Sequence, residues 1–208
     1  MQIDEIRLLG LGGSNKLMAG EVSRLVRRAF DQQLSREIIS SAPRKLGPGG
    51  LSFPYRPELA EVITEYHRTG ARALWALASL RSTRLEPLYD ELLEDLMQDQ
   101  RPWQEQDFRF SVLAFHTDAT EAGERQVVGV VKNALLAAAT QKGRNWQLDP
   151  ERPDVVFQIR GEKSEEDPRL VFSVDLAGRA LHERGYRIWS GDAPLREDRA
   201  AQLVMLSR

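Results

Sequence analysis

The chain has 208 residues, with 29 basic and 31 acidic side chains and a formal net charge of -2. Hydrophobic residues make up 41% and charged residues 29% of the sequence, proportions typical of a folded protein, and they exclude a disordered chain. No apolar run approaches the roughly 18 residues that a membrane-spanning helix needs. The acidic start, MQIDEIR, does not resemble a secretion signal. We therefore expect a cytoplasmic protein without a membrane segment.

The sequence offers few ligands for a metal ion. It contains no cysteine, which excludes disulfides, thiolate zinc sites and cysteine nucleophiles. The three histidines, His67, His116 and His182, are widely separated and lack the short spacing of metal ligands. We expect no metal site. Because the net charge is close to zero, any nucleic-acid surface must be a local patch of cations.

The first eighty residues alternate between strands and helices. The expected elements are a strand and a helix within 6–30, strands at 37–40 and 51–55, a helix at 57–70 and a strand at 73–80. This order is that of the split βαβ, or ferredoxin-like, unit. His67 is expected in the last turn of the second helix, as a structural residue.

Three glycines, Gly10, Gly12 and Gly13, lie between the first strand and its helix. Such a loop roughly resembles one that binds a dinucleotide or S-adenosylmethionine, but it lacks a third glycine at the helix start and an acid after the next strand. The simpler interpretation is a strand-to-helix turn followed by a buried stripe. The stripe residues are Val22, Leu25, Val26 and Ala29.

The second half predicts a different arrangement. The expected elements are a helix at 86–97, a strand at 107–115, a long helix at 123–143 and a hairpin of strands at 154–161 and 170–176. In the long helix, the predicted buried stripe is Val127, Val128, Val131, Leu135 and Ala138. Arg125, Gly129 and Lys132 share the opposite side, and the glycine leaves a gap that a phosphate could approach.

The segment from DVVFQIRG (154–161) through LVFSVDLAGRALHERGYR (170–187) to APLREDRAAQLVMLSR (193–208) resembles the THUMP-containing RNA methyltransferases. It is most similar to those that make N2-methylguanine in large-subunit ribosomal RNA. The residues in the family's motif places are Asp175, Leu176, Ala177, Gly178, Leu181, His182, Arg184, Gly185, Tyr186, Arg187, Ala193 and Pro194. Upstream, residues 50–94 look like the family's passage from its ferredoxin-like unit into THUMP.

The resemblance implies an α+β protein with a ferredoxin-like domain at 1–80 and a THUMP domain at 81–190. Residues 191–208 would be the linker and first helix of a methyltransferase domain. The implied partners are structured, ribosomal RNA and that downstream domain. The candidate RNA-binding residues are Arg125, Lys132, Arg179, His182, Arg184, Tyr186 and Arg187.

No catalytic or cofactor-binding residue is expected in this chain. The family's glycine-rich loop for S-adenosylmethionine and its Asn/Asp-Pro-Pro-aromatic motif do not occur in the sequence. The cofactor would belong to the parent enzyme.

Three alternatives remain open from the sequence. Tyr186 and Arg187 could pin the linker to the sheet, with Asp175 pairing one arginine. The chain could be a small enzyme that binds a nucleotide at Gly10–Gly13. It could also be a protein-interaction module that docks through the apolar side of the final helix, which consists of Leu203, Val204 and Leu206.

Overall fold

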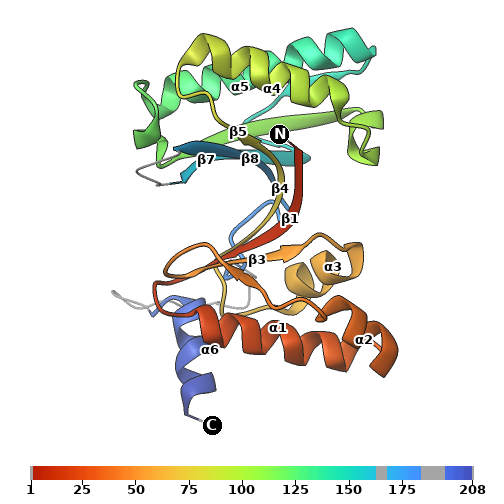
Figure 1. Ribbon diagram of the computed structural model, residues 1–208, viewed down its shortest axis with the longest axis vertical. Helices are drawn as coiled ribbons and strands as arrows, with labels where there is room; N and C mark the ends of the chain where they lie inside the picture. Colours follow the sequence, from red (N-terminus) through yellow and green to blue (C-terminus); the bar gives the residue numbers. More distant parts are fainter. Residues whose placement is uncertain (1, 163–167, 184–194, 208) are drawn as a thin grey trace. The chain divides into compact units, whose positions relative to one another are not determined.

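The computed structural model of the protein describes residues 2–162, 168–183 and 195–207 (Figure 1). Within these residues the strands form a mixed eight-stranded sheet in the order β2-β3-β1-β4-β8-β7-β5-β6. The chain divides into two compact units. The first unit consists of Glu5–Trp75 with Arg179–Arg208, and the second of Met1–Asp4 with Ala76–Gly178.

The first unit contains the predicted order of strands and helices with two additions, α2 and α6. Its elements are β1 (Gln2–Leu9), α1 (Asn15–Ala29), α2 (Gln32–Ile38), β2 (Arg44–Lys45), β3 (Gly50–Pro54), α3 (Pro57–Tyr66), β4 (Arg72–Leu80) and α6 (Glu197–Leu206); β1 and β4 continue into the second unit. β3 pairs antiparallel with both β1 and β2. The three helices α1, α2 and α3 lie on one side of β3 (Figure 1).

The core of the first unit follows from the alternation of the strands. Ile6 and Leu8 of β1 pair with Phe53 and Leu51 of β3, and all four side chains are buried. Alternate strand residues point to one face, so this face meets the apolar side of the helices. On α1 that side consists of Met18, Val22 and Val26, whereas Leu25 is half-buried and Ala29 is exposed. The predicted stripe was therefore wrong at its edge.

The strand predicted at 37–40 was wrong, because residues 32–38 form the helix α2. Asp31 caps this helix by accepting the N–H of Leu34 at 2.9 Å. The Ser35 hydroxyl donates to the Val26 carbonyl at 3.2 Å, and Ile38 is buried one turn later. Packing against α1 thus overrides the local strand preference of two adjacent isoleucines. The second strand is instead the two-residue β2.

The second unit has the elements predicted for it and three short additions. These elements are α4 (Leu85–Gln98), η1 (Pro102–Glu105), β5 (Phe108–Phe115), η2 (Thr117–Ala119), α5 (Glu124–Lys142), β6 (Trp146–Leu148), β7 (Val155–Glu162) and β8 (Arg169–Asp175). β7 and β8 form the predicted antiparallel hairpin, and β5 runs parallel to both β6 and β7. Parallel strands need a crossover, which α5 supplies. α4 and α5 lie side by side over one face of these strands (Figure 1).

Aromatic and leucine side chains fill the space between that face and the two helices. Phe110, Phe157 and Phe172 are almost completely buried, and the rings of Phe157 and Phe172 stack with centroids 5.2 Å apart. Each such side chain contributes about 1.5–3 kcal/mol through its burial. The predicted stripe of α5 is buried except for Val128, which is half-buried. In the part of the chain that the structure describes, no helix is long and apolar enough to cross a membrane.

Candidate nucleic-acid interface

The outward side of α5 carries the predicted pair of cations around a glycine. Arg125 is exposed, and Lys132 is half-buried about 10 Å further along the helix axis. A side chain added at Gly129 would have no neighbour within 4 Å. Neither cation forms an ion pair among the described residues. The structure therefore contains the predicted gap between two cations, and its contact with RNA stays a prediction.

The helix packed against α5 has the opposite charge. α4 carries five carboxylates and no cation, namely Glu86, Asp90, Glu91, Glu94 and Asp95. Three of these carboxylates, with Gln2 and Gln98, line an open hollow of about 440 Å³. A hollow with this charge repels phosphate groups. The α4 flank of the second unit is therefore a poor RNA surface.

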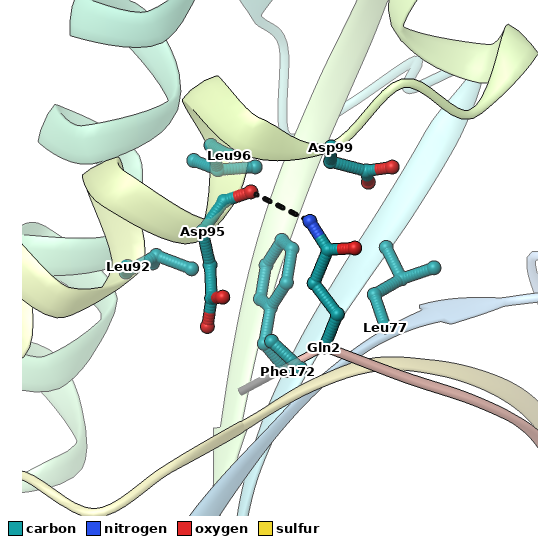
Figure 2. Close-up of a pocket in the computed structure, with 8 residues that line it drawn as sticks. Gln2, Leu77, Leu92, Asp95, Leu96, Asp99 and Phe172 are labelled. Atoms are coloured by element: carbon teal, nitrogen blue, oxygen red, sulfur yellow. Dashed lines mark hydrogen bonds between the residues drawn. The ribbon is translucent and has the colours of Figure 1, made fainter.

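A small cavity lies between α4 and the sheet (Figure 2). Leu77, Leu92, Leu96 and Phe172 contribute its apolar walls, and the Gln2 amide donates to the Asp95 carbonyl at 3.5 Å beside it. The cavity volume is about 10 Å³, enough for a single water molecule. It cannot hold a cofactor. No group of His, Asp and Glu side chains suited to a metal ion occurs among the residues that the structure describes.

The end of β8 is fixed by a buried carboxylate. Asp175 accepts a hydrogen bond from the Gln158 amide at 2.8 Å and one from the Ala177 N–H at 3.2 Å. Gly178, with a φ of 65°, then turns the chain in a conformation that favours glycine. Asp175 thus stabilises the turn that follows β8. Its pairing with an arginine stays a prediction.

Two of the five predicted residues in the basic segment can be placed. Arg179 is exposed, and the Leu181 N–H holds the segment to the residue just before β4 by donating to the Ala71 carbonyl at 2.8 Å. His182 is half-buried, and its buried Nδ1 atom has no hydrogen-bond partner among the described residues. The other three, Arg184, Tyr186 and Arg187, lie outside the described residues.

The glycine loop before α1 packs against another loop of the same unit. Gly10 donates its N–H to the Gly49 carbonyl at 2.7 Å. The side chain of Asn15 donates to the carbonyls of Gly47 and Gly50 and accepts the Gly49 N–H at 2.6 Å. A Cβ at Gly49 would lie 2.4 Å from the Leu11 carbonyl oxygen, so this contact requires glycine. A phosphate-binding loop needs free amides facing an open space. The Gly10 amide is thus occupied within the protein, whereas Gly12 and Gly13 are exposed, so binding of a nucleotide at this loop stays an alternative to be tested.

Sequence reasoning missed a buried polar cluster around Glu21 of α1. Its carboxylate accepts the N–H of Arg68 at 3.0 Å, and the N–H and hydroxyl of Thr69 at 2.9 and 2.6 Å. His67 is fully buried, with its Nδ1 atom 3.2 Å from the same carboxylate. His67 lies just after α3, not in its last turn as predicted, because the backbone is already extended there. The only signal in the sequence was an acid within the apolar side of α1.

The curated proteins that are similar to this chain share one name. The chain is 28% identical over 187 residues to a protein named ribosomal RNA large subunit methyltransferase K/L from Alteromonas mediterranea. The aligned region covers 86% of this chain and 25% of that protein. A protein of the same name from Photobacterium profundum is 42% identical over 80 residues, or 37% of this chain. The chain thus spans about a quarter or less of the length of these curated relatives. No family model matches the sequence.

Solved structures share the fold at low sequence identity. A predicted N6-adenine-specific DNA methylase from Listeria monocytogenes aligns with 98% of this chain and 48% of its own, with a TM-score of 0.69 and 22% identity. TrmN from Thermus thermophilus aligns with 98% of this chain and 54% of its own, with a TM-score of 0.66 and 19% identity. In both cases the similarity covers about half of the other chain.

Proposed function

We propose that this chain is the RNA-binding region of an S-adenosylmethionine-dependent methyltransferase that modifies guanine N2 in large-subunit ribosomal RNA. The observation that carries the proposal is the similarity over 86% of this chain to a K/L methyltransferase, of which it covers only 25%. The whole enzyme's activity would then depend on parts outside this sequence. We also propose a cytoplasmic location.

The strand order supports the proposed domains. The first unit has the strand order β2-β3-β1-β4 and, apart from α2, the element order of a ferredoxin-like fold. We assign this domain to residues 1–80 and a THUMP domain to residues 81–190, which includes α4, α5 and the β7–β8 hairpin. Residues 191–208 would link to a methyltransferase domain.

The proposed role of the chain is to hold folded RNA, without taking part in the chemistry. Double-stranded RNA presents phosphates, 2′-hydroxyls and shape, so cations on a rigid surface can bind it with little sequence preference. The proposed contacts from α5 are Arg125 and Lys132, and those from the segment after β8 are Arg179, His182, Arg184, Tyr186 and Arg187. S-adenosylmethionine would be held by the parent enzyme's other part. The Gly10 amide, which is occupied by the Gly49 carbonyl, supports that assignment.

A second candidate function is docking of a protein partner on α6. Leu203, Val204 and Leu206 are 57%, 54% and 68% exposed. Exposed apolar patches often mark interaction sites. The downstream methyltransferase domain would be the simplest partner for this surface.

Two binding measurements test the proposed function. Fluorescence anisotropy with structured fragments of large-subunit ribosomal RNA should show saturable binding that weakens steeply as salt rises. Calorimetry with S-adenosylmethionine should show no saturable heat for this chain. Failure to bind any structured RNA at low salt would refute the proposal. Micromolar cofactor binding that is lost in Gly12→Val would favour the nucleotide enzyme instead.

A further inference from the structure

The outer side of α1 carries a line of cations that the sequence patterns did not single out. Lys16, Arg24 and Arg27 lie at helical spacing with Gly20 between the first two, and all four residues are exposed. We call these four residues the α1 stripe. It extends about 16 Å along the helix axis. In Figure 1, α1 lies beside α6, and the Arg24 guanidinium contacts the Met205 sulfur of that helix at 3.2 Å.

No carboxylate pairs with the stripe among the described residues. Arg24 donates to the Gly20 carbonyl of its own helix, besides its contact with Met205. The one acid of α1, Glu21, is buried and is occupied by Arg68 and Thr69. Several other cations of the protein do pair with carboxylates: Arg44 with Glu5, Arg109 with Asp154 and Arg196 with Asp198. The stripe is thus a concentration of positive charge in a chain of net charge -2.

Helix stability does not explain the stripe. Lys16 lies in the first turn, where the helix dipole favours acids, and that turn contains none. Gly20 is less favourable than alanine inside a helix, and no neighbour lies within 4 Å of where its Cβ would be. Arg27 does suit the dipole, because it lies in the last turn. Residues that break local rules without a packing reason are expected at functional positions.

The stripe repeats the pattern already seen on α5. There, Arg125 and Lys132 flank Gly129, which also has open space around it. In α1, Lys16 and Arg24 flank Gly20 in the same way. In both helices the glycine leaves bare backbone between two cations, where a phosphate group can approach closely. The two helices therefore offer the same chemistry from two units of the chain.

We propose that the α1 stripe is a second RNA-binding surface, which contacts several phosphate groups of the backbone and reads no base. The inference rests on the proposed function, since it takes folded RNA as the polyanion. An anionic membrane is a poorer partner for this helix. Interfacial helices insert an apolar face into the lipid, whereas the apolar face of α1, with Met18, Val22 and Val26, is buried in the protein's own core.

The test uses the full chain and structured ribosomal RNA fragments over a range of salt. Each of Lys16→Gln, Arg24→Gln and Arg27→Gln should weaken binding several-fold and reduce the slope of log affinity against log salt by about 0.7–0.9. Arg36→Gln is the matched control, because Arg36 is an exposed cation of the neighbouring α2. This control should leave both the affinity and the slope unchanged.

Gly20→Ala separates binding from folding. The added methyl group should raise the thermal midpoint, because alanine favours the helix, and should weaken RNA binding by crowding the phosphate. If the three glutamine variants and Gly20→Ala all bind RNA as the wild type does, the inference is overturned and the proposed function stands. If the wild-type chain binds no RNA, both are overturned. Binding to vesicles with phosphatidylserine that is lost in the same variants, without any effect on RNA, would identify a membrane surface instead.

Discussion

The Gln158 amide donates a hydrogen bond of 2.8 Å to the Asp175 carboxylate, and both side chains are buried. This bond ties β7 to the end of β8, where the chain turns into the basic segment.

Asp175→Ala would leave two donors unsatisfied, the Gln158 amide and the Ala177 N–H. It should therefore destabilise the protein by about 1–3 kcal/mol for each of these donors. Urea unfolding measures the loss. Asp90→Ala, an exposed acid of α4, is the control and should change stability by less than about 0.5 kcal/mol. Equal losses in the two variants would contradict the assigned role.

The cluster around Glu21 predicts a second stability effect. Glu21→Gln replaces one of the two carboxylate oxygens with an amide donor, although both oxygens accept N–H groups. We expect a loss of about 2–4 kcal/mol, since a buried acceptor is replaced by a donor that faces other donors. Glu37→Gln on the exposed side of α2 serves as the comparison and should be nearly neutral. Thermal unfolding of the two variants tests this, and a stable Glu21→Gln protein would show that the cluster is dispensable.

The Asp154 carboxyl group should titrate at unusually low pH, because it is paired with Arg109. Hydrogen bonds from the Arg109 side chain and backbone lower the pKa of Asp154 from 3.8 to about 2. Because the folded pKa is depressed, the pair's stabilising effect is present above pH 3.8 and is lost as the pH falls through 2. NMR of the Asp154 carboxyl carbon should show this low midpoint in the wild type. In Arg109→Gln the midpoint should move back up toward 3.8. An unchanged midpoint in that variant would mean that another group perturbs the carboxylate.

The cations predicted from the sequence should all contact RNA through its phosphate groups. Lys132→Ala, Arg184→Ala and Arg187→Ala should each reduce the salt slope of RNA binding by about 0.7–0.9, with little change in sequence preference. Salt titrations of the three variants beside the wild type provide the measurement. If all three keep the wild-type slope but lose thermal stability, the segment after β8 is a structural clamp and not an RNA surface.

The apolar side of α6 should cause weak self-association of this chain. Leu203 and Leu206 are more than half exposed, so replacing either with glutamate should cost little folding stability. Sedimentation at high protein concentration should show association for the wild type and less of it for Leu203→Glu and Leu206→Glu. A strictly monomeric wild type would remove the support for a docking surface on this helix.

The sequence by itself determined the long, strongly periodic elements of this protein. The spacing of Val127, Val131 and Leu135 predicts α5 without any tertiary information, and the polar loop between two apolar runs predicts the β7–β8 hairpin. Gly129 between two cations was also visible in the sequence, because spacing along one helix fixes which residues share its face. These features are local in the chain.

Only the tertiary structure decided the features that depend on distant neighbours. Residues 32–38 form a helix because Ser35 and Ile38 pack against α1, and the Gly10 amide is occupied because the Gly49 carbonyl lies against it. The burial of Glu21 depends on donors from residues 68 and 69, which are 47 and 48 positions away. Whether a lysine or arginine lacks a carboxylate partner, as in the α1 stripe, is likewise decided by which surfaces the fold brings together. Local sequence patterns do not encode such pairings, since charges and hydrogen-bond donors act through space.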